Sequence, residues 1–339
     1  MRILVTGANG HLGQACVRDL LEHGYEVRAS VRNLKSAAKI EGLSKLDIEL
    51  VEADLFDQGS LDDACKDCDG VFQLAACYQF FQVFDEHQMV KTGTEGAKNL
   101  LRAAEKSGVS RVVLTSSIAA IGPTTKGMPP ATETDWNTDI SIPYFRQKIE
   151  GERAARDLVK ELSVDLVTVC PGMVIGPYFR KNTPSVDNIE AIAKGALFWG
   201  APNIRLALVD VRDAAIVHRL SFERGISGGR YLAVENSYSM YSIAKHLNTV
   251  DPKIKLPLVQ LPSFFNVLLP LFDAVNSRIC NCPRIINREM EKAFRGKDFI
   301  FSGDQTRIAL NWEPNFSVTE SLAGTLDTLR ENGRYSVHA

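Results

Sequence analysis

The sequence predicts an α/β chain built on a doubly wound parallel sheet, and three observations carry this prediction. Residues 2–6 have the apolar character of a buried strand. Three glycines spaced by three follow that strand, and residues 14–23 then show the apolar spacing of an amphipathic helix. Strand patterns continue to alternate with helix patterns as far as residue 175, which is typical of βαβ units.

The glycine turn between the first strand and the first helix suits a bound phosphate. Glycine tolerates unusual backbone angles, lets main-chain N–H groups approach a pyrophosphate and allows a helix to pack tightly on a strand. The start of the helix adds unpaired N–H donors and the positive end of the helix dipole. We therefore predict a Rossmann-like turn that binds a dinucleotide through Gly7, Asn9, Gly10, His11, Leu12 and Gly13.

The second strand pattern, residues 25–32, ends in Arg32, at the place where the adenosine ribose of a dinucleotide should lie. An acidic residue there would select NAD, whereas a guanidinium group can bind the 2′-phosphate of NADP through paired hydrogen bonds. Lys35 follows closely, and Lys39 is a further candidate. The pattern predicts NADP(H) as the preferred cofactor and NAD(H) as the alternative, unless Arg32 is only a solvated surface residue.

Four later strand patterns end in residues that could line a crevice. They cover residues 46–53, 70–76, 111–117 and 164–170, and a helix pattern covers residues 93–106. The carboxyl ends of parallel strands meet at one edge of a sheet, where open α/β sheets bind ligands. Small side chains there let a flat ligand lie against the backbone, and a carboxylate can accept from an adenine amine. The expected cofactor contacts at these ends are Asp54, Leu55, Leu74, Ala75, Ala76, Thr115, Ser116, Pro171, Gly172 and Val174.

Tyr144 and Lys148 stand four positions apart in a long helix pattern that begins at Pro143, so their side chains share one face of that helix. A tyrosine ordinarily has a pKa of about 10, and a neighbouring ammonium lowers that pKa by favouring the phenolate. Lys148 can also hold ribose hydroxyls, and Ser117, at the end of a strand, can donate to a carbonyl oxygen. We predict that these three residues are catalytic and that Tyr144 and Lys148 also contact the cofactor.

The predicted domain organisation is a dinucleotide-binding Rossmann domain over residues 1–175, joined by a later strand and helix around 205–220, and a mostly substrate-binding region over 176–335. Residues 256–275 are strongly apolar, but three prolines and an aspartate interrupt them, so a membrane-spanning helix is not expected. We expect this segment to be a buried cap over a substrate pocket, and a peripheral membrane contact is the alternative.

Composition argues against several classes of protein. The 39 basic and 41 acidic residues give a formal net charge of −2, so no nucleic-acid surface or polybasic membrane patch is expected. The seven cysteines are an odd number, so we expect no disulfide framework. A strand pattern begins at Arg2, so we expect no leader and a cytoplasmic location. Cys65 and Cys68 form the only C-x-x-C pair, but it lacks a second pair or histidines at zinc-site spacing, and Cys280-Asn-Cys282 is similarly unspecific, so no metal site is predicted.

Together these motifs resemble the extended short-chain dehydrogenase/reductase superfamily over almost the whole chain. The resemblance rests on Gly7-x-x-Gly10-x-x-Gly13, Asp54-Leu55, Leu74-Ala75-Ala76, Thr115-Ser116-Ser117, Tyr144-x-x-x-Lys148 and Pro171-Gly172-x-Val174-x-Gly176-Pro177. Residues 27–32, 91–92 and 133–136 look closest to the dihydroflavonol 4-reductase-like branch, which includes aldehyde and ketone reductases.

This resemblance implies a role for each residue of the catalytic group. Tyr144 would be the general acid/base, Ser117 would orient the carbonyl oxygen, and Lys148 would lower the tyrosine pKa and bind the nicotinamide ribose. Ser117 matches the family's catalytic serine because it is the last hydroxyl before small apolar residues, and Ser116 then lines the cofactor.

Three positions depart from the family pattern. Gly93 stands where many members have an asparagine, which places a proton relay through that side chain in doubt. Gly122 stands where plant flavonoid reductases carry a polar residue, so a flavonoid substrate is not supported. Gln73 replaces a histidine, a change that we expect to be tolerated.

The predicted function is the NADPH-dependent, reversible reduction of a small-molecule aldehyde or ketone by a monomer or homodimer without nucleic-acid binding or stable membrane insertion. One alternative is a nucleotide-sugar epimerase or dehydratase that holds NAD, against which Arg32 argues. Another is a 3β-hydroxysteroid-type dehydrogenase, favoured by the apolar residues 256–275. A non-catalytic NADP sensor is disfavoured because Tyr144 and Lys148 are both present.

Overall fold

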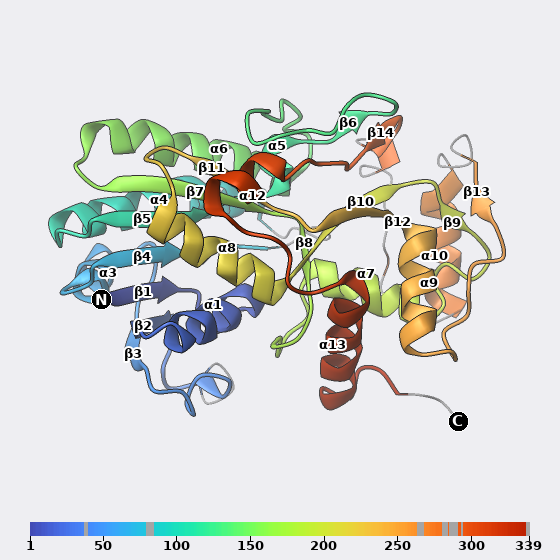
Figure 1. Ribbon diagram of the computed structural model, residues 1–339, viewed down its shortest axis with the longest axis horizontal. Helices are drawn as coiled ribbons and strands as arrows, with labels where there is room; N and C mark the ends of the chain where they lie inside the picture. The colour runs from blue at the N-terminus through green and yellow to red at the C-terminus, as the bar shows by residue number, and fades with distance from the viewer. Residues whose placement is uncertain are drawn as a thin grey trace.

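The computed structural model describes residues 1–36, 40–78, 85–262, 268–279, 284, 291–292 and 294–336. Within this part of the chain, a seven-stranded sheet forms the centre of the molecule, with strand order β11-β7-β5-β4-β1-β2-β3 (Figure 1). Its pairs are all parallel. The strands are β1 (Arg2–Thr6), β2 (Glu26–Val31), β3 (Glu49–Glu52), β4 (Gly70–Gln73), β5 (Arg111–Thr115), β7 (Asp165–Pro171) and β11 (Arg230–Ala233).

Helices cover both faces of this sheet, which confirms the predicted doubly wound fold. Helices α1 (His11–Glu22) and α8 (Val211–Arg224) pack side by side on one face (Figure 1). Helices α3 (Gln58–Cys65), α4 (Glu86–Lys106) and α6 (Pro143–Leu158) share an apolar core with the other face. The strand order reverses between β1 and β4, the point at which such sheets bind ligands.

A second layer of elements packs beyond the carboxyl edge of the sheet. Strands β8 (Met173–Ile175), β10 (Arg205–Asp210) and β12 (Asn236–Ser239) form a three-stranded sheet. It shares a core with α7 (Pro184–Ala193), α9 (Met240–Val250) and α13 (Val318–Glu331). The shorter elements are α5 (Ile118–Ile121), β6 (Thr124–Thr125), η1 (Val159–Glu161), β9 (Ala201–Pro202), β13 (Gln260–Leu261), α10 (Leu269–Ile279), β14 (Lys297–Asp298) and α12 (Asp304–Leu310).

Two elements differ from their predicted extents or places. The helix predicted over 93–106 begins earlier, at Glu86. Its first turns carry few apolar residues, so the sequence shows no apolar stripe there and the predicted helix started too late. The strand predicted near 205 forms as β10, but it pairs with β8 and β12 in the smaller sheet, while β11 provides the edge of the central sheet. At Gly172 the chain passes directly from β7 to β8, and β10 follows β8 out of the central sheet.

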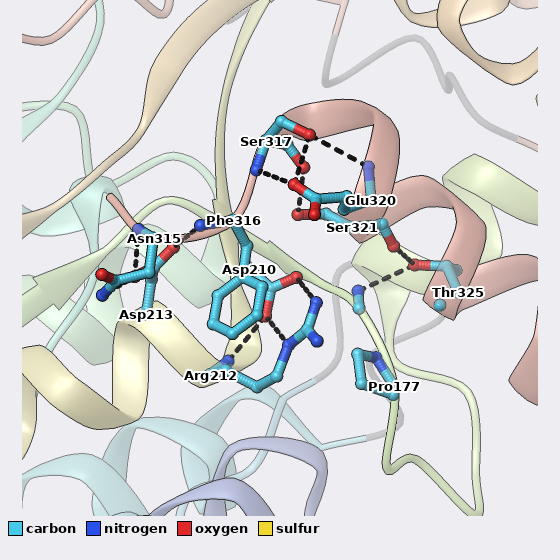
Figure 2. Close-up of polar contacts among 12 residues, drawn as sticks. Pro177, Asp210, Arg212, Asp213, Asn315, Phe316, Ser317, Glu320, Ser321 and Thr325 are labelled. Carbon is cyan, nitrogen blue, oxygen red and sulfur yellow. Dashed lines mark hydrogen bonds and ion pairs between the residues drawn. The ribbon is translucent and has the colours of Figure 1, made fainter. Parts of the chain in front are cut away.

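Polar contacts fasten the last helix to the loop that follows β8 (Figure 2). The buried carboxylate of Asp213 accepts hydrogen bonds from the backbone N–H groups of Asn315 and Phe316, at 2.9 and 3.1 Å. About two turns into α13, the Thr325 hydroxyl accepts from the Gly176 N–H at 2.7 Å. The C-terminal segment therefore holds the loop at Gly176, and the next residue, Pro177, contacts the His11 side chain on the cavity wall.

The apolar segment 256–275 does not form the predicted buried cap within the described residues. Residues 263–267 lie outside them, as do Cys280 and Cys282. Of the described side chains, Leu258 and Leu271 expose 61% and 65% of their surface. No helix in the described part of the chain is both long enough and apolar enough to cross a membrane.

Helices α4 and α6 cross at Gly93 and Gly151, where their backbones nearly touch. A Cβ atom on Gly93 would lie 2.8 Å from the carbonyl oxygen of Gln147, and one on Gly151 would lie 2.8 Å from the carbonyl oxygen of Gly93. An asparagine at position 93 would therefore push the helices apart. This close crossing seats α6, and with it Tyr144 and Lys148, against the sheet.

We expect Gly93→Ala to lower the free energy of unfolding by about 1–3 kcal/mol, because overpacking at the crossing outweighs the higher helix propensity of alanine. Gly59→Ala is the matched control: its Cβ would lie 3.4 Å from the nearest atom, an Asp57 carboxylate oxygen, so it should be neutral or stabilising. Urea unfolding of both variants measures the difference. A Gly93→Ala protein as stable as the parent would show that the crossing of α4 and α6 can accommodate a methyl group.

Candidate active site

A cavity of about 740 Å³ opens at the carboxyl edge of the central sheet. Its walls come from the ends of the parallel strands on one side and from α7, β10 and α9 on the other. The structure brings together here all the predicted site residues except Lys35. They are Gly7, Asn9, Gly10, His11, Leu12, Gly13, Arg32, Asp54, Leu55, Leu74, Ala75, Ala76, Thr115, Ser116, Ser117, Tyr144, Lys148, Pro171, Gly172 and Val174.

The glycine turn is packed so tightly that side chains cannot replace its first and last glycines. Gly7 has a φ of 63°, and a Cβ there would lie 2.9 Å from the backbone of Ala75. A Cβ on Gly13 would lie 2.3 Å from the Gly7 carbonyl oxygen. Helix α1 begins directly after Gly10 without a side-chain cap, so its first N–H groups are free to bind an anion.

The His11 side chain has a role that the sequence did not indicate. Its Nε2 lies 2.8 Å from the carbonyl oxygen of Pro177, and burial lowers the pKa of His11 to about 4. The ring is therefore neutral at physiological pH, and it links the glycine turn to the loop after β8. The spacing of the motif gave no sign of this contact, because the two residues are far apart in the sequence.

Arg32 and Lys35 differ in their position relative to the cavity. The exposed Arg32 guanidinium lies just beyond the end of β2 on the wall of the cavity and has no hydrogen-bond or ion-pair partner among the described residues. Lys35 is exposed and does not line the cavity, because the chain turns away after Asn33. Lys39 lies outside the described residues. Of the two described residues, Arg32 and Lys35, Arg32 alone lines the cavity.

Ser117, Tyr144 and Lys148 converge at the centre of the cavity. The Tyr144 hydroxyl forms a hydrogen bond with the Ser117 side chain. Ser117 caps α5, where its Oγ accepts from the Ala119 N–H at 3.1 Å. Lys148 lies one turn after Tyr144 on α6, and its Nζ donates to the Thr115 carbonyl oxygen at 3.1 Å. The arrangement places two hydroxyls side by side, with a buried cation nearby.

The protonation of this group differs from the prediction. Burial raises the pKa of Tyr144 well above its ordinary value, the nearby Tyr78 raises it further, and the hydrogen bond from Ser117 only partly opposes them. The predicted lowering by Lys148 is not seen, because burial, Tyr78 and Ser117 set the pKa of Tyr144 while the Lys148 ammonium donates to the Thr115 carbonyl oxygen. Burial also lowers the pKa of Lys148 to about 8.

The hydroxyls of the strand end around Ser117 face different partners. Ser116 Oγ donates to the buried Glu152 carboxylate at 2.6 Å. Thr115 Oγ1 lies 2.9 Å from Nε2 of His218, whose Nδ1 is 2.7 Å from a backbone carbonyl, so the threonine donates to this nitrogen. Both side chains are thus occupied within the protein. Ser117 is the serine placed beside Tyr144, and its predicted catalytic role stays a prediction.

The other departures from the family pattern have local explanations. Gln73 Nε2 donates to the Ala75 carbonyl oxygen at 3.1 Å and so steadies the end of β4. Gly122 has a φ of 92°, and a Cβ there would lie 2.9 Å from the Asn137 side chain. A polar side chain at position 122 would therefore be strained as well as crowded.

The half of the cavity beyond Tyr144 is lined by residues that sequence reasoning missed. They come from separate segments with no common spacing, so no motif marks them. Among the described residues, the charged side chains on the cavity wall are Arg32, Asp54 and Lys148, and none lies in this half. Its hydroxyl, amide and apolar side chains include Tyr78, Ser185, Asn188, Leu206, Met240 and Phe299.

Comparison with known protein sequences places this chain among oxidoreductases and their relatives. A family model described as the NAD dependent epimerase/dehydratase family matches residues 3–233. The cinnamoyl-CoA reductase CAD2 of Medicago truncatula is 34% identical over 272 residues, which cover 75% of this chain and 82% of the relative. A dihydroflavonol 4-reductase of Zea mays is 30% identical over 275 residues, which cover 75% and 76%.

Comparison with solved structures agrees on the fold. The yeast methylglyoxal/isovaleraldehyde reductase Gre2, solved in complex with NADPH, matches with a TM-score of 0.77 at 21% identity. The match covers 99% of this chain and 100% of the yeast chain. The arrangement of the central sheet and the second layer is therefore shared over the whole length.

The lowered pKa of Lys148 predicts a pH-dependent stability. The pKa of Lys148 is 10.5 in the unfolded chain and about 8 in the folded protein. Below about pH 8 the ammonium is charged in both states, and holding it in the protein lowers the free energy of unfolding. This cost shrinks as the pH rises above 8 and vanishes toward pH 10.5. We expect Lys148→Met to be more stable than the parent protein at neutral pH, with the difference shrinking above pH 8. Urea unfolding of both proteins across this range measures it. A difference that does not change with pH would contradict the assignment.

Proposed function

The chain belongs to the NAD dependent epimerase/dehydratase family, in the extended short-chain dehydrogenase/reductase superfamily, and we propose that it uses NADPH to reduce an aldehyde or ketone. It is an NAD(P)-dependent oxidoreductase that acts on CH–OH and carbonyl groups. The observation that carries the proposal is the hydrogen-bonded pair of Ser117 and Tyr144, set opposite the glycine turn in one cavity. The relatives named above as reductases support it.

The residues of the cavity fit a bound dinucleotide. The free N–H groups at the start of α1 would hold the pyrophosphate, and Asp54, at the carboxyl edge, would accept from the adenine amine. Lys148 has donor capacity beyond its bond to Thr115, and it would hold the nicotinamide ribose. When bound, NADPH supplies the hydride that adds to the carbonyl carbon.

Ser117 and Tyr144 act on the carbonyl oxygen. With substrate bound, the Ser117 hydroxyl would donate to the carbonyl oxygen in place of the Tyr144 oxygen, so both hydroxyls would donate to it and stabilise the negative charge that develops there. The Tyr144 phenol is protonated at neutral pH, and it can give its proton to the developing alkoxide because an alkoxide is a much stronger base than a phenolate.

Arg32 would select NADP over NAD. Its guanidinium lies on the cavity wall at the end of β2 and has no partner among the described residues, so binding a phosphate would not break an existing ion pair. Arginine binds phosphate in a bidentate manner, which a ribose hydroxyl cannot match.

The nucleotide-sugar alternative fits the substrate half of the cavity less well. A nucleotide sugar carries a diphosphate, and the described residues beyond Tyr144 offer it no cation. The apolar side chains of Leu206, Met240 and Phe299 instead suit an uncharged ketone, including one of the hydroxysteroid type. A non-catalytic sensor would not need the Ser117–Tyr144 pair.

We expect Tyr144→Phe to lower kcat by about 100-fold or more, because the variant has no proton to donate, while NADPH binding stays nearly unchanged. Initial rates of NADPH oxidation with a panel of aldehydes and ketones, together with a cofactor titration, measure both quantities. A folded variant that loses NADPH binding would count against this role for Tyr144.

We expect Arg32→Ala to lower kcat/KM for NADPH by about tenfold or more, since a charge-assisted pair with phosphate is lost, and to leave the value for NADH nearly unchanged. Lys35→Ala is the matched control, because this lysine is exposed and does not line the cavity. Equal losses with both cofactors in Arg32→Ala would argue against the assignment.

A further inference from the structure

Helix α10 turns apolar side chains toward solvent and covers a charged one. Leu271, Phe272 and Val275 are exposed, with 65%, 56% and 49% of their surfaces open to water. Val275 stands four positions after Leu271 and three after Phe272, so the three side chains share one face of the helix. The Asp273 side chain is only 13% exposed, and its carboxylate is ion-paired with Arg284 at 3.1 Å. A helix at the surface of a soluble domain normally has the opposite arrangement.

A second group of exposed apolar side chains lies beside the strand pair of β9 and β13. Trp199 exposes 67% of its surface, and Leu258 and Val259 are also exposed. The Leu258 N–H donates to the Phe198 carbonyl oxygen at 2.9 Å, so Leu258 lies beside the residue that precedes Trp199. The Ala201 N–H donates to the Val259 carbonyl oxygen at 2.9 Å, just after Trp199. Helix α10 lies at the same end of the molecule as β9 and β13 (Figure 1).

Cations accompany both apolar groups. Lys253, Lys255 and Arg278 are exposed and form no ion pair with another described residue. The Lys255 Nζ lies 5.4 Å from the centre of the Phe198 ring, next to the second group. Arg278 follows Val275 by three positions, so it continues the exposed face of α10. The whole chain has a formal net charge of −2, so this positive charge is a local feature.

We propose that these residues form a docking surface for an anionic phospholipid membrane. We call it the α10/Trp199 surface, and its apolar residues are Trp199, Leu258, Val259, Leu271, Phe272 and Val275. Large apolar patches on a protein mark contacts with partners or membranes. A lipid interface receives protruding Trp, Phe and Leu side chains in any arrangement, whereas a protein partner would need a surface shaped to fit both groups.

The cations decide which lipids the surface fits. Lysine and arginine near a bilayer are attracted to anionic headgroups and gain little from zwitterionic ones. The contact is peripheral, because no helix in the described part of the chain is long and apolar enough to cross a membrane. This proposal concerns a face outside the cavity and does not rest on the proposed reductase function.

The test is cosedimentation of the purified protein with two kinds of vesicle. One is made of phosphatidylcholine alone, and the other is an equal mixture of phosphatidylcholine and phosphatidylglycerol. We expect binding to the mixed vesicles at low ionic strength, and we expect this binding to weaken as salt is added, because salt screens the attraction to the headgroups. Trp199 fluorescence should shift to the blue on binding, and Trp199→Phe should lose most of this shift.

We expect Phe272→Glu to lower the partition onto the mixed vesicles by about tenfold or more, because it removes a buried apolar contact and adds a charge repelled by the headgroups. Ile308→Glu is the matched control. Ile308 is 83% exposed on α12, outside the α10/Trp199 surface, so its replacement should leave binding unchanged. Both substitutions replace exposed side chains, and thermal unfolding checks that both variants are folded.

Any of four results would overturn the proposal. The first is the absence of binding to either kind of vesicle. The second is equal binding to both kinds, which would show that the cations take no part. The third is unchanged binding by Phe272→Glu, which would place the contact elsewhere. The fourth is a dimer, detected by light scattering, that Phe272→Glu dissociates while neither protein binds vesicles, which would assign the surface to a second copy of this chain.

Discussion

The site depends on close approaches between backbones that only glycine permits. Gly7 and Gly13 bring the first turn against the end of β4 and against each other, which aims the start of α1 at the cavity. Gly93 and Gly151 do the same for α4 and α6, so that Tyr144 reaches Ser117 across the sheet edge. A side chain at any of these four positions would displace a main element rather than a flexible group.

Burial then sets the chemistry of the groups that these contacts bring together. Tyr78, Tyr144 and Lys148 line one cavity, where burial raises the pKa of Tyr144 and lets the Lys148 ammonium lose its proton more easily than in water. The charged side chains on the described cavity wall are Arg32, Asp54 and Lys148, and they lie in the half that would hold the cofactor. The polar side chains of the other half carry hydroxyl and amide groups. This division is consistent with a charged cofactor and a neutral substrate sharing one cavity.

The sequence predicted the fold and most of the cofactor half because those signals are local. Glycine spacing, strand ends and the four-residue step from Tyr144 to Lys148 each fit within one βα unit. The partners of His11 and Thr115 were not predictable, since Pro177 and His218 reach them from distant segments. The same holds for the lining of the substrate half, which the tertiary fold assembles. The pKa of Tyr144 was predicted in the wrong direction because spacing reveals a neighbouring charge but not the extent of burial. The roles of the site residues stay predictions.

The most direct test of the account follows the hydride itself. The purified protein is supplied with NADPH that carries deuterium at both C4 positions of the nicotinamide and with an aldehyde or ketone that it turns over, and the product is examined by mass spectrometry and NMR. The account predicts one deuterium on the new alcohol carbon for each NADP⁺ released into solution. Unlabelled product that is an isomer of the substrate, with the cofactor unconsumed, would contradict the account and indicate an epimerase.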